Sequence, residues 1–116
     1  MNLPERDWKN LRVLHRVALE RYCARVLDES RTIVADETGS AHERYLRLHG
    51  LLEERNQALA AAFEDMRRST AISRLAALVN LAVVTDEELH DFSVPTRDSA
   101  LALAQVLKPL ARRGPA

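Results

Sequence analysis

Residues 36–43 read Asp-Glu-Thr-Gly-Ser-Ala-His-Glu, and this stretch decides the fold that the sequence predicts. Gly39 suits the left-handed backbone conformation in which many helices end. Ser40, followed three residues later by Glu43, forms the capping box that is typical of a helix start. The stretch therefore predicts a stop and a restart between two helices, with the turn at residues 38–39.

The chain on both sides of this turn lacks the residues that interrupt helices. Between Pro4 and Pro95 lie 90 residues with no proline and only two glycines. A sheet protein of this size needs a turn every ~8–12 residues, whereas long helices do not. We therefore expect an all-α chain with one helical-bundle domain over residues 1–111 and a frayed tail at 112–116. The expected helices cover about residues 4–36, 40–68, 71–84, 86–92 and 96–110.

Apolar residues recur every three or four positions along both long helices, which is the pattern of a helix packed on one side. If the chain folds back at residues 38–39, positions whose numbers sum to about 77 face each other. The two apolar stripes, identified independently, then meet. We expect a long antiparallel α-hairpin that carries the shorter C-terminal helices. The facing pairs include Leu14 with Phe63, Tyr22 with Arg55, Val26 with Leu52, and Ile33 with Tyr45.

The charge balance limits the classes of partner. The chain has 116 residues with 17 basic and 17 acidic side chains, so its formal net charge is zero. Nucleic acids and anionic membranes attract basic surfaces, so we expect neither as a partner. The longest apolar run, residues 75–84, contains Asn80 and is far shorter than the ~20 residues of a membrane span. With one cysteine and no apolar leader, we expect a cytoplasmic protein, and the excess of arginine over lysine suggests a bacterial one.

The helices offer more apolar surface than they can cover among themselves. The segment 71–84 is apolar nearly all round, and the first helix has a second apolar face that includes Val13 and Val17. We therefore expect a two-fold dimer, the commonest closed assembly. The predicted function is non-catalytic protein–protein interaction, as a self-associating adaptor or as a regulator of a partner protein. The expected partner-binding residues are Val13, Val17, Gly50, Arg55, Leu78 and Leu81.

Two features inside the hairpin have alternative interpretations. Tyr22, Arg55 and Asn56 form a polar layer between the arms, which either fixes the helix register or forms a ligand or partner pocket. Gly50 lies within the second helix, where it costs ~1 kcal/mol relative to alanine. This cost predicts that another helix approaches Gly50 closely.

Metal or ligand binding is an alternative function. His42, His49 and Glu53 share one helix face, but two histidines seven residues apart are ~10 Å apart along the axis. Glu87 and His90 have the spacing of one half of a di-iron motif, and the second half is missing. We therefore expect no metal, no cofactor and no catalytic residue.

A DNA-binding regulator is the second alternative. The last helix supplies Arg97, Gln105 and Lys108 among mostly apolar residues, which is a poor set for contacting base edges.

Cys23 has no histidine within one turn, so we expect a structural thiol.

Overall fold

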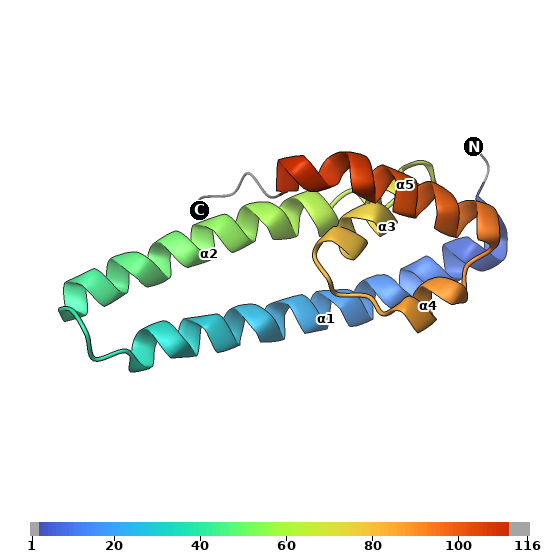
Figure 1. The fold of residues 1–116 in the computed structure, drawn as a ribbon. Helices are drawn as coiled ribbons and strands as arrows, with labels where there is room; N and C mark the ends of the chain where they lie inside the picture. Colours follow the sequence, from blue (N-terminus) through green and yellow to red (C-terminus); the bar gives the residue numbers. More distant parts are fainter. Residues whose placement is uncertain (1–2, 112–116) are drawn as a thin grey trace.

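The structure, a computed structural model, describes residues 3–111 and the side chains of residues 3–107. This part of the chain contains helices and connecting turns and no strand, which confirms the all-α prediction. The molecule measures 53 × 25 × 23 Å (Figure 1). The elements are α1 (Glu5–Ala35), α2 (Ala41–Phe63), the 3-10 turn η1 (Arg68–Thr70), α3 (Ala71–Asn80), α4 (Asp86–His90) and α5 (Val94–Ala111).

Helices α1 and α2 form the predicted antiparallel hairpin. Gly39 has a positive φ of 86° at the turn. The hydroxyl of Ser40 accepts the backbone N–H of Glu43, and the Glu43 carboxylate accepts the backbone N–H of Ser40, so the predicted capping box is confirmed. Arg47 lies 3.1 Å from Asp36 across the turn, which ties the two helix ends together.

The register of the hairpin agrees with the prediction near its middle. The hydroxyl of Tyr22 donates to the carbonyl oxygen of Arg55 at 3.1 Å, and the ring of His15 lies 5.2 Å from that of Phe63. The expected inward position of Tyr45 is wrong, because this side chain is 65% exposed. Leu48, one turn further along the same stripe, is half-buried.

Helix α2 ends at Phe63, five residues earlier than expected. Asp65 adopts a left-handed conformation with a φ of 57°, and the Thr70 hydroxyl donates to its carbonyl oxygen at 2.6 Å. Arg74 donates to the carbonyl oxygens of Ala61 and Glu64, which the end of the helix leaves free. These contacts terminate α2 without a glycine or a proline.

Helix α3 ends at Asn80 rather than at residue 84. Ala82 is left-handed, with a φ of 58°. Its N–H donates to the carbonyl of Val79 at 3.0 Å, and the N–H of Val83 donates to that of Leu78 at 3.3 Å. This pair of hydrogen bonds is the Schellman motif, which usually requires glycine at the position that Ala82 occupies.

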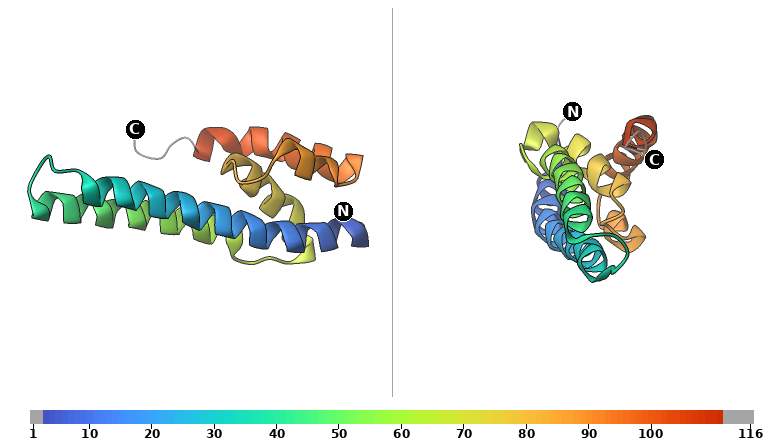
Figure 2. Two further views of the ribbon diagram at one scale, coloured as in Figure 1. Left: turned by 90° about the horizontal axis from the view of Figure 1, so that it is seen from below. Right: turned by 90° about the vertical axis from the view of Figure 1, so that its left-hand side faces the viewer.

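Helix α3 lies between the hairpin and α5 (Figure 2). In the end-on view, α3, α4 and α5 lie on one side of the hairpin, and none of them covers its other side. The core gathers at the end of the hairpin where α1 begins. Its fully buried residues include Leu11, Ala18, Leu75, Ala76, Leu78 and Ala100.

The described helices include none that is both long enough and apolar enough to cross a membrane. The tail expected to fray, residues 112–116, lies outside the described residues. Helix α4 ends two residues earlier than expected, and α5 begins two residues earlier, at Val94. The early start of α5 has a tertiary cause, because Asp7 of α1 binds its first turn.

Candidate protein-interaction surface

The outer face of α1, which we define as Val13, Val17, Ala24, Leu27 and Val34, lies on the opposite side of this helix from its buried residues. The four larger side chains of this face are exposed, Val13 by 61% and Leu27 by 63%. Such exposure is costly for large apolar side chains that line up on one helix. The outer face therefore lies open in the described structure, as the expected roles of Val13 and Val17 require.

Helix α2 adds apolar surface on the edge of the hairpin. Tyr45, Leu46 and Leu52 are exposed by 65%, 53% and 39%. With Val13, Val17, Leu27 and Val34, seven of the ten exposed large apolar residues among the described side chains belong to the hairpin. The exposed apolar side chains are thus concentrated on the hairpin, where α4 borders Val13 and Val17.

A groove of about 210 Å³ opens between the two arms of the hairpin. Its walls come from Cys23, Val26 and Leu27 on α1 and from Asn56 and Leu59 on α2, and Tyr22 and Arg55 line it too. The lining is mostly apolar, and Cys23 is a half-buried free thiol. The groove continues the apolar surface of the hairpin toward its interior.

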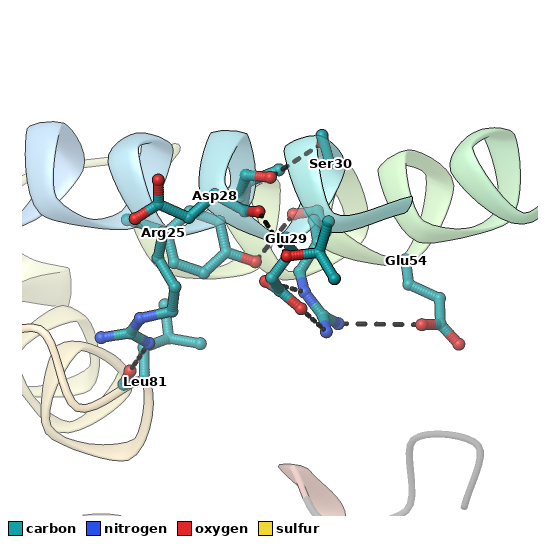
Figure 3. A network of polar contacts seen from close by, with 10 residues as sticks. Arg25, Asp28, Glu29, Ser30, Glu54 and Leu81 are labelled. Atoms are coloured by element: carbon teal, nitrogen blue, oxygen red, sulfur yellow. Dashed lines mark hydrogen bonds and ion pairs between the residues drawn. The ribbon is translucent and has the colours of Figure 1, made fainter. Parts of the chain in front are cut away.

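The residues of the predicted polar layer line this groove. Figure 3 shows Glu29 and the polar contacts around it. The guanidinium of Arg55 makes two hydrogen bonds to the Glu29 carboxylate, at 3.1 Å from Nε and 2.8 Å from an Nη. Such a two-pronged pair fixes the orientation of both side chains. Asn56, expected in the same layer, is exposed, and Glu29 is the side chain that binds Arg55. Nothing in the sequence distinguishes Glu29, because a glutamate is ordinary on a helix surface.

The pKa values of the layer follow from these contacts. The hydrogen bond from Arg55 holds the pKa of Glu29 below its ordinary value and raises that of Arg55. Burial raises the pKa of Tyr22, whose hydroxyl donates to a backbone carbonyl. All three groups therefore keep their ordinary charge at neutral pH. The layer joins the two helices at one register. This is what the interpretation of Tyr22 and Arg55 as residues that fix the helix register requires.

The expected partner-binding role of Leu78 in α3 needs correction, whereas Leu81 follows the end of α3. Leu78 is 0% exposed, because the hairpin and α5 cover α3 from two sides. Leu81 is half-buried, and its carbonyl oxygen accepts a hydrogen bond from Arg25 at 2.6 Å. Leu78 thus belongs to the core rather than to a contact surface.

Gly50 is half-exposed on α2. A Cβ atom at this position would meet nothing within 4 Å. No other helix of the described chain therefore approaches Gly50 closely. A helix that packs closely on Gly50, as the sequence predicts, would therefore have to belong to a partner molecule.

The groups considered for metal binding lie on the surface. His49 is 3.6 Å from Glu53, with both side chains more than 60% exposed, and His42 is exposed as well. The Nδ1 of His90 lies 2.7 Å from the carbonyl oxygen of Asp86 on its own helix. Within residues 3–111, no three histidine, cysteine, aspartate or glutamate side chains form a group able to hold a metal ion.

The residues considered for DNA contact are spread over α5. Arg97 is half-buried and Gln105 is exposed, while the Lys108 side chain lies outside the described part. Three acidic residues, Asp86, Glu87 and Glu88, occupy the first turn of nearby α4. Phosphates would be repelled by this acidic turn.

Sequence reasoning missed one buried polar cluster. Asp7 is 1% exposed, and its carboxylate accepts hydrogen bonds from Ser93 and Thr96. In the sequence, Asp7 fits the usual acidic first turn of a helix, and only the fold brings Ser93 to it. The Asp7 carboxylate accepts three hydrogen bonds, two from Ser93 and one from Thr96, and they hold the start of α5 against α1. The cluster therefore has a structural role.

Comparison with known proteins gives no guide to function. No protein-family model matches the chain, and no curated protein and no solved structure matches it.

Proposed function

We infer that the protein acts through protein–protein contacts made by its hairpin, without catalysis, as a self-associating adaptor or as a regulator of a partner protein. The observation that carries this proposal is the uneven distribution of exposed apolar side chains. Seven large ones lie on α1 and α2, four of them along the outer face of α1. A concentration of exposed apolar side chains on one part of a folded protein is typical of an interaction site.

The remaining architecture supports this role. The core and two arginine side chains hold α1 in place. Arg21 forms an ion pair with Glu88 at 2.7 Å, and Arg25 donates hydrogen bonds to the carbonyl oxygens just after α3. The distal half of the hairpin extends beyond α3–α5 (Figure 1). A rigid projecting hairpin presents its side chains at fixed spacing, which is the requirement for recognising another helix.

Affinity capture with matched variants tests the proposal. Tagged wild type, Leu27→Lys and Val106→Lys are isolated from the native cells, and the bound proteins are counted by mass spectrometry. Val106 is 70% exposed on α5 and serves as the control for a new lysine. We expect wild type and Val106→Lys to retain the same proteins, further copies of the chain included, and Leu27→Lys to lose them.

Equal capture by all three proteins, or no capture by wild type, contradicts the proposal. Two further measurements address the alternative functions. Elemental analysis that finds a stoichiometric metal favours a metal-binding bundle. A mobility shift of DNA at low salt favours a DNA-binding regulator.

A further inference from the structure

The outer face of α1 belongs to a longer stripe with a regular spacing. Adding Glu20 and Arg31 to its five apolar residues gives positions 13, 17, 20, 24, 27, 31 and 34, which alternate steps of four and three. All seven side chains are exposed. A strict seven-residue repeat of this kind is the pattern of a coiled-coil contact between two helices. It covers 22 residues, about 32 Å of helix.

The stripe is also complementary to itself when its direction is reversed. From residue 17 to residue 34 it reads Val, Glu, Ala, Leu, Arg, Val. A second copy running antiparallel, about an axis midway between Ala24 and Leu27, places Glu20 opposite Arg31 and Ala24 opposite Leu27. The outermost pair is then Val17 opposite Val34.

We propose that α1 pairs with α1 of a second copy of this chain as an antiparallel coiled coil in this register, centred between Ala24 and Leu27. The pairing deepens the proposed function by naming its partner and therefore rests on it. A two-fold axis makes each pair occur twice, so the dimer gains two Glu20–Arg31 contacts. A parallel pair would instead oppose Glu20 to Glu20 and Arg31 to Arg31, which disfavours that orientation.

The rest of the molecule leaves room for this partner. Next to Val17 the surface has a groove of about 190 Å³, whose lining includes Val13 and Phe92. The register places Val34 of the second copy over Val17, at the edge of this groove. In the single chain Arg31 pairs with Asp28 at 2.7 Å, with both side chains more than 70% exposed. Such surface pairs contribute about 0–1 kcal/mol, so Arg31 is free to exchange partners.

A charge swap tests the pairing. Sedimentation equilibrium under reducing conditions measures the dimer dissociation constant of wild type, Glu20→Arg, Arg31→Glu and the double variant. We expect wild type to dimerise and each single variant to weaken the dimer at least about tenfold, because two like-charge pairs appear. The double variant restores the attraction and should recover the wild-type constant within about threefold.

Glu53→Arg is the control for the charge change, since Glu53 is exposed on α2 away from the stripe. It should dimerise as wild type does. Circular dichroism of every variant verifies that the helices are intact. A double variant as weak as the single variants overturns the proposed register.

Cysteine cross-linking tests the orientation independently. Val17→Cys and Val34→Cys are made separately in a Cys23→Ser background and oxidised mildly. We expect a disulfide-linked dimer only when the two proteins are mixed. A covalent dimer formed by each protein alone indicates a parallel pair and overturns the proposal.

A wild type that stays monomeric at every concentration overturns the dimer. If capture from cells then still depends on Leu27, the interaction surface stands and its partner is a different protein. If capture fails as well, both proposals fall.

Discussion

Asp7 in the first turn of α1 caps α5 through Ser93, a residue 86 positions later in the chain. Its Oδ1 accepts the backbone N–H of Ser93 at 3.0 Å, and its Oδ2 accepts the Ser93 hydroxyl at 2.5 Å. The Thr96 hydroxyl adds a third hydrogen bond at 2.6 Å. Two distant helices are thus joined by one buried carboxylate.

This arrangement makes Asp7→Asn destabilising. An amide offers one acceptor oxygen in place of two and carries no charge, so at least one donor loses its partner. We expect a loss of about 1.5–3 kcal/mol in the free energy of unfolding at neutral pH. Denaturant titration measures it, with Asp91→Asn as the control, since Asp91 is exposed. Equal stability of the two variants would show that the cluster contributes nothing.

The pH dependence of Asp7 has a definite sign. Burial raises the pKa of Asp7, but the hydrogen bonds from Ser93 and Thr96 outweigh burial and hold it below 3.8. A lowered carboxyl pKa stabilises the fold at pH values above the ordinary pKa of 3.8, and this stability is lost as pH falls through the folded pKa. Asp7→Asn should therefore lose less stability on acidification than wild type does.

Asp36 at the hairpin turn should titrate at an unusually low pH. Hydrogen bonds from the side chain and backbone of Thr38, aided by Arg47, lower the pKa of Asp36 to about 2. Its stabilising effect is therefore complete near pH 4 and lost as pH falls toward 2. Carboxyl NMR measures the titration midpoint. Thr38→Val should raise it toward 3.8, and an unchanged midpoint would exclude the hydroxyl as a cause.

Ala82→Gly should stabilise the protein. The left-handed conformation of Ala82 costs an L-residue about 1–2 kcal/mol, and glycine removes this cost while adding about 0.4–1 kcal/mol of chain entropy to the unfolded state. We expect a net gain of about 0.5–1 kcal/mol in thermal unfolding experiments. Ala102→Gly, at an exposed position inside α5, is the opposite control and should cost about 1 kcal/mol. Destabilisation by both substitutions would contradict the strain at Ala82.

The hairpin could be predicted because local signals and long-range pattern agree. The capping box at Ser40 set the turn, and the apolar stripes set the register that brings Tyr22 to Arg55. The ends of α2 and α3 could not be predicted, because Asp65 and Ala82 take left-handed conformations that the sequence does not indicate at these positions. Arginine side chains from other elements compensate there by binding the free carbonyl oxygens.

The candidate surface was predictable only in part. The periodicity of apolar residues predicted the outer face of α1, and no other segment of the sequence was expected to pack on that face. Leu78 was misassigned because an apolar helix does not reveal which of its sides meets the core. Glu29 and Asp7 were missed because their partners come from other helices, and only the fold brings Arg55 and Ser93 to them.

Gly50→Ala tests two effects of this glycine separately: its low helix propensity, which lowers the stability of the monomer, and its contact with a partner. A Cβ at Gly50 meets nothing within 4 Å, so alanine adds helix propensity without a clash. We expect the free energy of unfolding of the monomer to rise by about 0.5–1 kcal/mol. The sequence also predicted a close approach at Gly50, and that approach now requires a partner molecule.

If a partner helix packs closely on Gly50, the added methyl group weakens binding in the capture experiment although the monomer is more stable. Unchanged capture by Gly50→Ala removes Gly50 from the contact surface and leaves the outer face of α1 as its centre. Ala61→Ser, an exposed substitution on the same helix, controls for small changes of α2. A drop in monomer stability with Gly50→Ala would instead show that the helix around Gly50 is not regular.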